Sequence, residues 1–102
     1  MIIMTDKLID KRVIVRCDRS GVFYGTLAAR DGREVKMEDV RCIWCWRGAA
    51  TLLQLAAEGV KDKTGSRFTM SVKSLVLLDA IEILPCSDEA IKNIDSVPVW
   101  KM

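Results

Sequence analysis

The spacing of apolar residues changes near residue 47, and this change constrains the fold more than any other feature of the chain. Before it, short runs rich in β-branched residues alternate apolar and polar positions, which is typical of strands. The turn sequences Asp18–Gly21 and Arg30–Arg33 separate these runs, and the Asp-Gly pair in the second favours a tight hairpin. After residue 47, apolar residues recur three and four positions apart, as along one face of a helix. We therefore expect the chain to begin as a small sheet and to continue with a helix.

The predicted elements form an α+β domain. Pro85 ends the last predicted strand, and Ser87 is placed to cap a helix whose first turn is acidic. Short strands joined by tight turns are typical of small barrels. We predict a single domain over residues 1–102, in which a small curled antiparallel sheet, an SH3-like barrel, carries two short helices. The predicted strands cover residues 11–17, 22–29, 34–37, 40–46, 67–72 and 75–84, and the predicted helices cover residues 48–59 and 88–94.

Charge and hydropathy argue against two classes of protein. The 102 residues carry 16 basic and 14 acidic side chains, so the formal net charge is only +2, and we expect no dedicated nucleic-acid binder. No apolar run approaches the roughly 18 residues that a membrane span needs. The first ten residues lack the basic region and the long apolar region of a secretory signal. We expect a soluble, cytoplasmic protein with no membrane partner.

The residue types exclude most catalytic sites. The chain contains no histidine, which removes imidazole-based triads and every metal site that needs histidine. It has no glycine-rich phosphate loop of the Walker or Rossmann kind. The carboxylate pairs Glu38/Asp39 and Asp88/Glu89 fall in a predicted turn and in the first turn of a predicted helix, where structural roles explain them. We therefore expect no enzyme activity.

Cys42 and Cys45 form a C-x-x-C motif, and Cys17 and Cys86 could complete a four-cysteine zinc site. On an extended strand, however, positions three apart point to opposite faces, so both thiols reach one metal only if the strand turns sharply. A thioredoxin-like pair needs its cysteines at the start of a helix, and the predicted helix begins later. We expect the cysteines to be small apolar core residues, with no metal, no cofactor and no obligatory disulfide.

Two tryptophans in the motif Cys42–Gly48 lie beside an arginine and a predicted helix start. An indole face can stack on a flat base, and the free N–H groups of a helix start can bind phosphate together with an arginine. The alternative is that both indoles are core, packed between sheet and helix. The candidate ligand-binding residues are Trp44, Trp46, Arg47, Gly48 and Thr51, with Arg41, Arg16 and Tyr24 as possible contributors.

Four segments carry a resemblance to a known family: SGVFYGTLAARDGREV, RCIWCWRGAATLLQLAAEGV, RFTMSVKSLVLLDAIEILPCSDEAI and VPVWK. Together they resemble a small phage and prophage protein family of unknown function, over roughly Lys11–Lys101, through the ordered pattern W-x-W-x-G-A-A, E-I-x-P-C and V-P-V-W. The family has no settled activity, so no residue role is carried over. The resemblance implies a counter-defence setting in the cytoplasm of an infected bacterial host, with a host defence protein or a nucleotide second messenger as partner.

Three hypotheses remain open. The first is a sponge that binds a signalling nucleotide at the tryptophan motif without cleaving it. The others are a protein-binding inhibitor of a host defence factor and a small-barrel nucleic-acid-binding module. We also expect the apolar tail Val97–Trp100 to dock on the domain. Because residues 74–84 carry more apolar surface than two short helices can cover, we expect a homo-oligomer, most simply a two-fold dimer.

Overall fold

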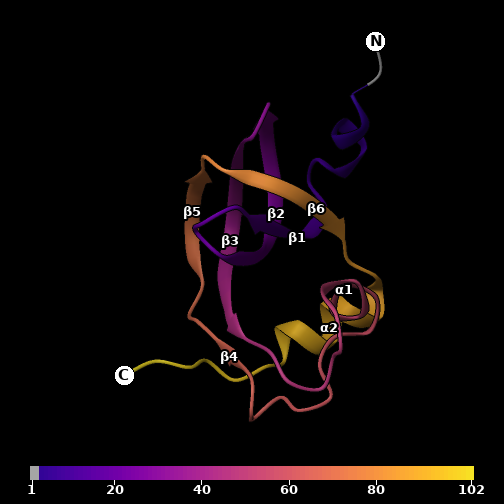
Figure 1. Cartoon of the computed structure of the whole chain (residues 1–102), viewed down its shortest axis with the longest axis vertical. Coiled ribbons are helices and arrows are strands. Elements are labelled where there is room, and N and C mark those ends of the chain that lie inside the picture. Colours follow the sequence, from indigo (N-terminus) through magenta and orange to yellow (C-terminus); the bar gives the residue numbers. More distant parts are fainter. Residues whose placement is uncertain (1–2) are drawn as a thin grey trace.

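The computed structural model describes residues 3–102 and has nine elements (Figure 1). A short 3₁₀ turn is followed by a three-stranded meander, a helix, three further strands and a second helix. In chain order these are η1 (Met4–Leu8), β1 (Arg12–Cys17), β2 (Val22–Asp31), β3 (Glu34–Cys45), α1 (Leu52–Glu58), β4 (Arg67–Phe68), β5 (Val72–Leu77), β6 (Ala80–Pro85) and α2 (Asp88–Asp95).

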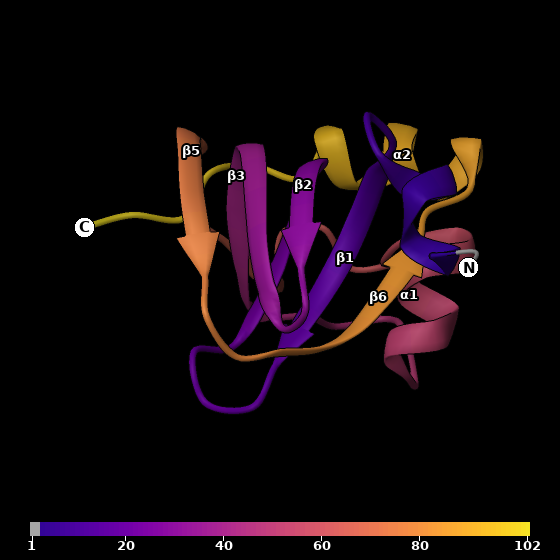
Figure 2. The same cartoon turned by 90° about the horizontal axis from the view of Figure 1, so that it is seen from above.

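The six strands form one curled antiparallel sheet in the order β4-β3-β2-β1-β6, and β5 also pairs with β3. Figure 2 shows β5, β3, β2, β1 and β6 side by side, with the chain crossing from the β5 edge to the β6 edge. The tight β2–β3 hairpin that the sequence predicts forms within Arg30–Arg33, with Gly32 and Arg33 in the turn and Asp31 paired with Glu34. The predicted class, an α+β domain with a small curled sheet and two short helices, is confirmed.

The third and fourth predicted strands are one strand, β3, bent at Asp39, which has a positive φ of 51°. Asp39 tolerates this left-handed backbone better than most residues do. At the bend β2 comes very close, because a Cβ on Gly25 would lie 2.9 Å from the carbonyl oxygen of Glu38. Val40 still pairs with Val72 of β5 beyond the bend, so the strand continues where two strands were expected.

The single long strand predicted over residues 75–84 is wrong, because the chain breaks at Leu78 and Asp79. The Asp79 carboxylate accepts hydrogen bonds from the backbone N–H of Arg19 at 2.8 Å and from the hydroxyl of Ser20 at 2.7 Å. These bonds tie the break to the β1–β2 turn. The halves, β5 and β6, then pair at separate places, with β3 and with β1.

Both helices have the cap residues that local chemistry favours. Thr51 and Ser87 accept hydrogen bonds from the backbone N–H groups of Gln54 and Ala90. Helix α2 matches its prediction to one residue, whereas α1 begins at Leu52, four residues later than expected. The two helices lie together on one side of the sheet (Figure 1).

Buried apolar residues form two clusters on opposite faces of β1. Ile14 belongs to the cluster that includes α1 and α2 residues, whereas Val13 and Val15 belong to a cluster of strand residues. Successive side chains of a strand point to opposite faces, so β1 is covered on both sides and all three residues are fully buried. Over residues 3–102, no helix is long and apolar enough to cross a membrane.

Candidate functional site

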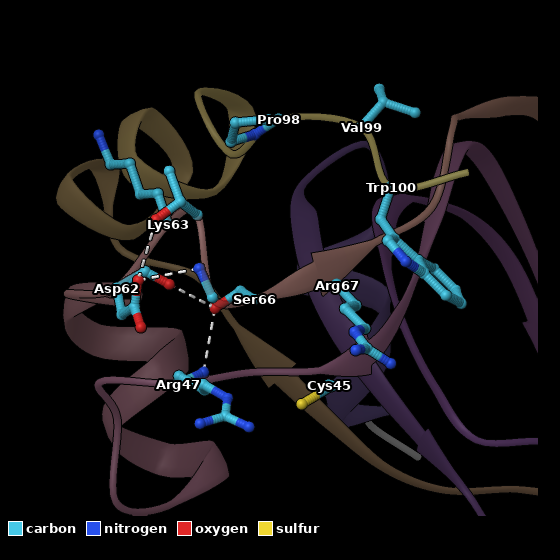
Figure 3. Close-up of a pocket in the computed structure, with 11 residues that line it drawn as sticks. Cys45, Arg47, Asp62, Lys63, Ser66, Arg67, Pro98, Val99 and Trp100 are labelled. Atoms are coloured by element: carbon cyan, nitrogen blue, oxygen red, sulfur yellow. Dashed lines mark hydrogen bonds between the residues drawn. The ribbon is translucent and has the colours of Figure 1, made fainter. Parts of the chain in front are cut away.

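A cleft of about 530 Å³ lies where the end of β3, the loop 61–66, β4 and the C-terminal tail meet (Figure 3). Its size falls within the roughly 300–1,000 Å³ that is usual for small-molecule sites. Its lining combines basic, small polar and aromatic residues: Cys45, Arg47, Asp62, Lys63, Thr64, Gly65, Ser66, Arg67, Pro98, Val99 and Trp100.

Hydrogen bonds hold one wall of the cleft together. The backbone N–H of Arg47 donates to the Ser66 hydroxyl at 3.0 Å, and that hydroxyl donates to the Asp62 carbonyl at 2.8 Å (Figure 3). The Asp62 N–H donates back to the Arg47 carbonyl at 3.2 Å. Within the loop, the Asp62 carboxylate accepts from the Gly65 N–H at 2.8 Å. Hydrogen bonds within the protein therefore fasten the loop to the corner that follows β3.

The opposite wall carries the Trp100 indole, which stacks on Trp44 just outside the cleft lining. Trp44, near the end of β3, is 59% exposed, and its ring stacks on that of Trp100 with centroids 5.1 Å apart and planes 21° from parallel. The backbone N–H of Trp100 donates to the Phe68 carbonyl at 2.9 Å, and Val99 forms an isolated β-bridge with Phe68. The predicted docking of the tail is therefore confirmed. The exposed Trp44 indole leaves aromatic surface open beside the cleft.

The Arg67 guanidinium lies 5.4 Å from the ring centroids of both Trp44 and Trp100, within the range of cation–π attraction. Arg67 and Trp100 come from one side of the cleft, while Arg47 and Lys63 come from the other (Figure 3). The two ion pairs formed within residues 3–102 involve none of these three cations. Only one carboxylate, that of Asp62, lines the cleft against them. The site therefore offers net positive charge beside aromatic surface.

The structure places Arg41 and Tyr24, two of the predicted ligand-binding residues, in the interior and outside the cleft lining. Arg41 is 7% exposed, its guanidinium donates to backbone carbonyl groups, and it does not line the cleft. Tyr24 is fully buried, and its hydroxyl donates to the Asp95 carboxylate at 2.8 Å. Burial raises the pKa of Tyr24 to about 12. Both residues support the framework.

Five other candidates also lie outside the cleft lining, and one of them, Trp44, borders the cleft only through its stack on Trp100. Trp46 is half-buried against the core cluster beneath the helices, so the two tryptophans do not form one platform. Arg16 lies on β1 and pairs with Glu82 at 3.0 Å. Thr51 uses its hydroxyl to cap α1, and Gly48 forms the corner before it. Because α1 begins only at Leu52, the helix start expected beside Arg47 is absent, and Arg47 is the predicted residue that lines the cleft.

Sequence reasoning missed Lys63, Ser66 and Arg67, and it treated Trp100 only as a docked tail. The loop 61–66 is predicted to be solvated, and neither its residues nor those of the short strand β4 indicate that the two form one site. Arg67 reaches the indoles because β4 pairs with the end of β3, Cys45 opposite Arg67. The one available signal was the apolar Trp100 in a tail that needed cover.

The cysteines show no arrangement for metal or redox chemistry. All four thiols are free, and residues 3–102 contain no group of three or more His, Cys, Asp or Glu side chains that could hold a metal. Burial raises the pKa of Cys42, and it raises that of Cys86 to about 12. These two thiols therefore stay protonated at neutral pH, whereas metal ligation and nucleophilic attack require the thiolate.

Comparison with solved structures finds a protein of similar fold. The chain is similar to the crystal structure of a heptameric archaeal Sm protein, described with its implications for the eukaryotic snRNP core. The TM-score is 0.54 at 17% identity, over 82% of this chain and 97% of that one, so the likeness is one of fold. A comparison with curated proteins gives no match. A family model described as a domain of unknown function matches residues 10–94, nearly the whole domain, and the chain belongs to that family, DUF6948.

Proposed function

We propose that this protein binds a nucleotide in the cleft and retains it without cleaving it. The observation that carries the proposal is the Arg67 guanidinium held over two stacked indoles beside two further cations, Arg47 and Lys63. Stacking of a base on an aromatic side chain contributes about 1–3 kcal/mol. A charge-assisted hydrogen bond to phosphate contributes roughly 1.5–3 kcal/mol. A flat base with attached phosphate uses both features of the site at once.

The groups that line the cleft support the proposal of retention without cleavage. The Ser66 hydroxyl is already engaged with the Asp62 carbonyl, and the Asp62 carboxylate is bound to the loop backbone. The chain contains no histidine to act as a general base. These features support a binding protein over a hydrolase.

The biological setting of this proposal is the phage resemblance of the sequence. A phage protein that holds a host signalling nucleotide would act as a sponge, lowering the free concentration of the signal and so countering a defence response. The small fold and the firmly built loop wall are compatible with binding that requires no chemical step.

The test is direct binding of a panel of nucleotides, followed by release on heating and chromatography of the ligand. A cyclic mononucleotide, a cyclic dinucleotide and ADP-ribose are added separately, and quenching of indole fluorescence reports binding. We expect at least one to bind and to be recovered intact. Arg67→Ala should weaken binding by about one to two decades, the cost of one charge-assisted contact.

Arg16→Ala is the matched control, because Arg16 is an exposed arginine that lies outside the cleft lining and pairs with Glu82. It should leave nucleotide affinity unchanged. Equal losses in the two variants would mean that binding follows overall charge and not the cleft. Recovery of a cleaved nucleotide, or no quenching by any member of the panel, would also contradict the proposal.

A second candidate is single-stranded nucleic acid, which the shared fold favours. The archaeal Sm protein is described in relation to the snRNP core, a ribonucleoprotein. Bases of a strand could stack on the exposed face of Trp44 while its phosphates meet the same cations. The salt dependence of binding separates the two candidates, because a strand that contacts several cations loses affinity steeply as salt rises and a free mononucleotide loses little.

We propose in addition that the chain forms a homo-oligomer through its edge strands. Within residues 3–102, β5 pairs only with β3 and β6 pairs only with β1, so each has a free edge among the described strands. Four apolar side chains on and between these strands are exposed: Val72, Val76, Leu78 and Ile81. Exposed apolar edges favour pairing with another chain. The archaeal Sm protein of similar fold is heptameric.

A further inference from the structure

Arg41 is a buried cation that joins three separate segments of the chain. Its Nε donates to the Thr69 carbonyl at 2.8 Å, one terminal nitrogen to the Ile94 carbonyl at 3.0 Å, and the other to the Val97 carbonyl at 3.0 Å. Longer bonds reach the carbonyl groups of Phe68 at 3.3 Å and Pro98 at 3.4 Å. These acceptors belong to β4 and the residue after it, the end of α2, and the tail.

Backbone carbonyl dipoles stabilise the positive charge of Arg41. Neither ion pair within residues 3–102 includes Arg41. Burial lowers the pKa of its guanidinium, but guanidinium remains charged in proteins. The Ile94 carbonyl belongs to the last turn of α2, where the helix dipole favours a cation. Without Arg41 the carbonyl groups of Thr69 and Val97 would lose this donor. Those of Ile94 and Phe68 would keep their bonds from the backbone N–H groups of Val97 and Trp100.

The segments that Arg41 joins are those that carry one wall of the cleft. Phe68 is the neighbour of Arg67, and Pro98 lies two residues before Trp100. Beyond Pro98 the tail is held by the bridge between Val99 and Phe68, by the Trp100 N–H bond to Phe68, and by the indole stack. A terminal segment with so few contacts is poorly ordered unless tied down.

We propose that Arg41 is the positioning residue of the cleft: it fixes β4 and the tail, and thereby sets Arg67 and Trp100 for binding, without touching the ligand. The ligand part of this inference rests on the proposed nucleotide function, whereas the positioning of Trp100 does not. The planar guanidinium group of arginine has five N–H donors and reaches all three segments. The compact ammonium group of lysine carries the same charge but cannot reach all three.

The test compares Arg41→Lys with Arg12→Lys. Arg12 also has a multiply bonded, part-buried guanidinium, but its partners are Thr26, the Asp39 carbonyl and Asp95, none of them in β4 or in the tail. The readout in the absence of ligand is the circular-dichroism signal of the coupled indoles, with Trp100→Phe as the uncoupled reference. We expect Arg41→Lys to match that reference and Arg12→Lys to keep the wild-type signal.

The binding readout uses ADP-ribose as the probe. If it binds the wild type, Arg41→Lys should weaken binding at least ten-fold while Arg12→Lys does not. A wild-type indole signal in Arg41→Lys would overturn the inference whether or not ADP-ribose binds. Loss of the indole signal together with no binding to the wild type would support the positioning role and remove ADP-ribose as the ligand.

A measurement on the wild type covers the case in which Arg41→Lys does not fold. If Arg41 ties the tail to the domain, the backbone amide of Trp100 should exchange with solvent as slowly as amides of the core strands. Exchange of the Trp100 amide at the rate of an unstructured terminus would overturn the inference.

Discussion

Gly48 lies at the corner between β3 and α1, and we predict that Gly48→Ala is strongly destabilising. Its φ of 89° is a conformation that side chains rarely adopt. An added Cβ would lie 2.6 Å from the backbone nitrogen of Lys61 and 2.7 Å from that of Asp62. Both contacts are with backbone, so no side-chain rotation relieves them, and the loop that forms one cleft wall must move.

The magnitude follows from two terms. Left-handed backbone costs an ordinary residue about 1–2 kcal/mol. Overpacking against a fixed structure costs roughly 1–3 kcal/mol more. Gly32→Ala isolates the first term, because Gly32 also has a positive φ, of 59°, but an added Cβ there meets nothing within 4 Å.

Urea unfolding measures the free energy of unfolding of both variants against the wild type. We expect Gly48→Ala to lose about 1–3 kcal/mol more than Gly32→Ala, a large part of the total stability of a small domain. Equal losses would refute the steric argument and show that the loop 61–66 yields without cost.

Two further predictions concern pH and assembly. Hydrogen bonds from Ser20 and Arg19 lower the pKa of Asp79 to about 2 from 3.8, so the native state binds fewer protons than the unfolded state. The resulting stability is present above about pH 3.8 and is lost as the pH falls towards 2; Asp79→Asn should remove this part of the acid dependence in a titration followed by circular dichroism. Light scattering should give the wild type a mass above that of one chain, and Val76→Lys on the β5 edge should reduce it; a wild-type monomer at all concentrations would contradict assembly.

The elements that the sequence predicted well are those set by neighbours in the chain. The turn sequence Arg30–Arg33 favours a tight hairpin, and the β2–β3 hairpin forms there with Gly32 in its turn. Ser87 caps α2 by bonding to an N–H three residues away. Such contacts lie within a few residues of each other, so residue types alone were sufficient.

The sequence misled where partners decide the backbone. Asp39 reads as a turn, yet β3 passes through it because β2 and β5 supply partners on both sides of the bend. The run from Leu75 to Leu84 reads as one strand, yet Asp79 bonds to the β1–β2 turn and divides it. At both positions, hydrogen bonds with residues far away in the chain override the local conformational preference of the backbone.

The sequence by itself determined the chemistry that this protein can use: no imidazole, arginine and tryptophan at the end of a strand, and a fold of hairpins with two capped helices. Only the tertiary structure decided which of these groups meet. The stack of Trp44 on Trp100 and the place of Arg67 beside it depend on the pairing of β4 with β3 and on the docking of the tail. The sequence suggested Arg41 as a ligand-binding residue. In the structure Arg41 instead holds that wall together, because its N–H groups donate to backbone carbonyl groups of three segments. Contacts of this kind join residues that are distant in the chain, so the spacing of residue types along the sequence does not predict them.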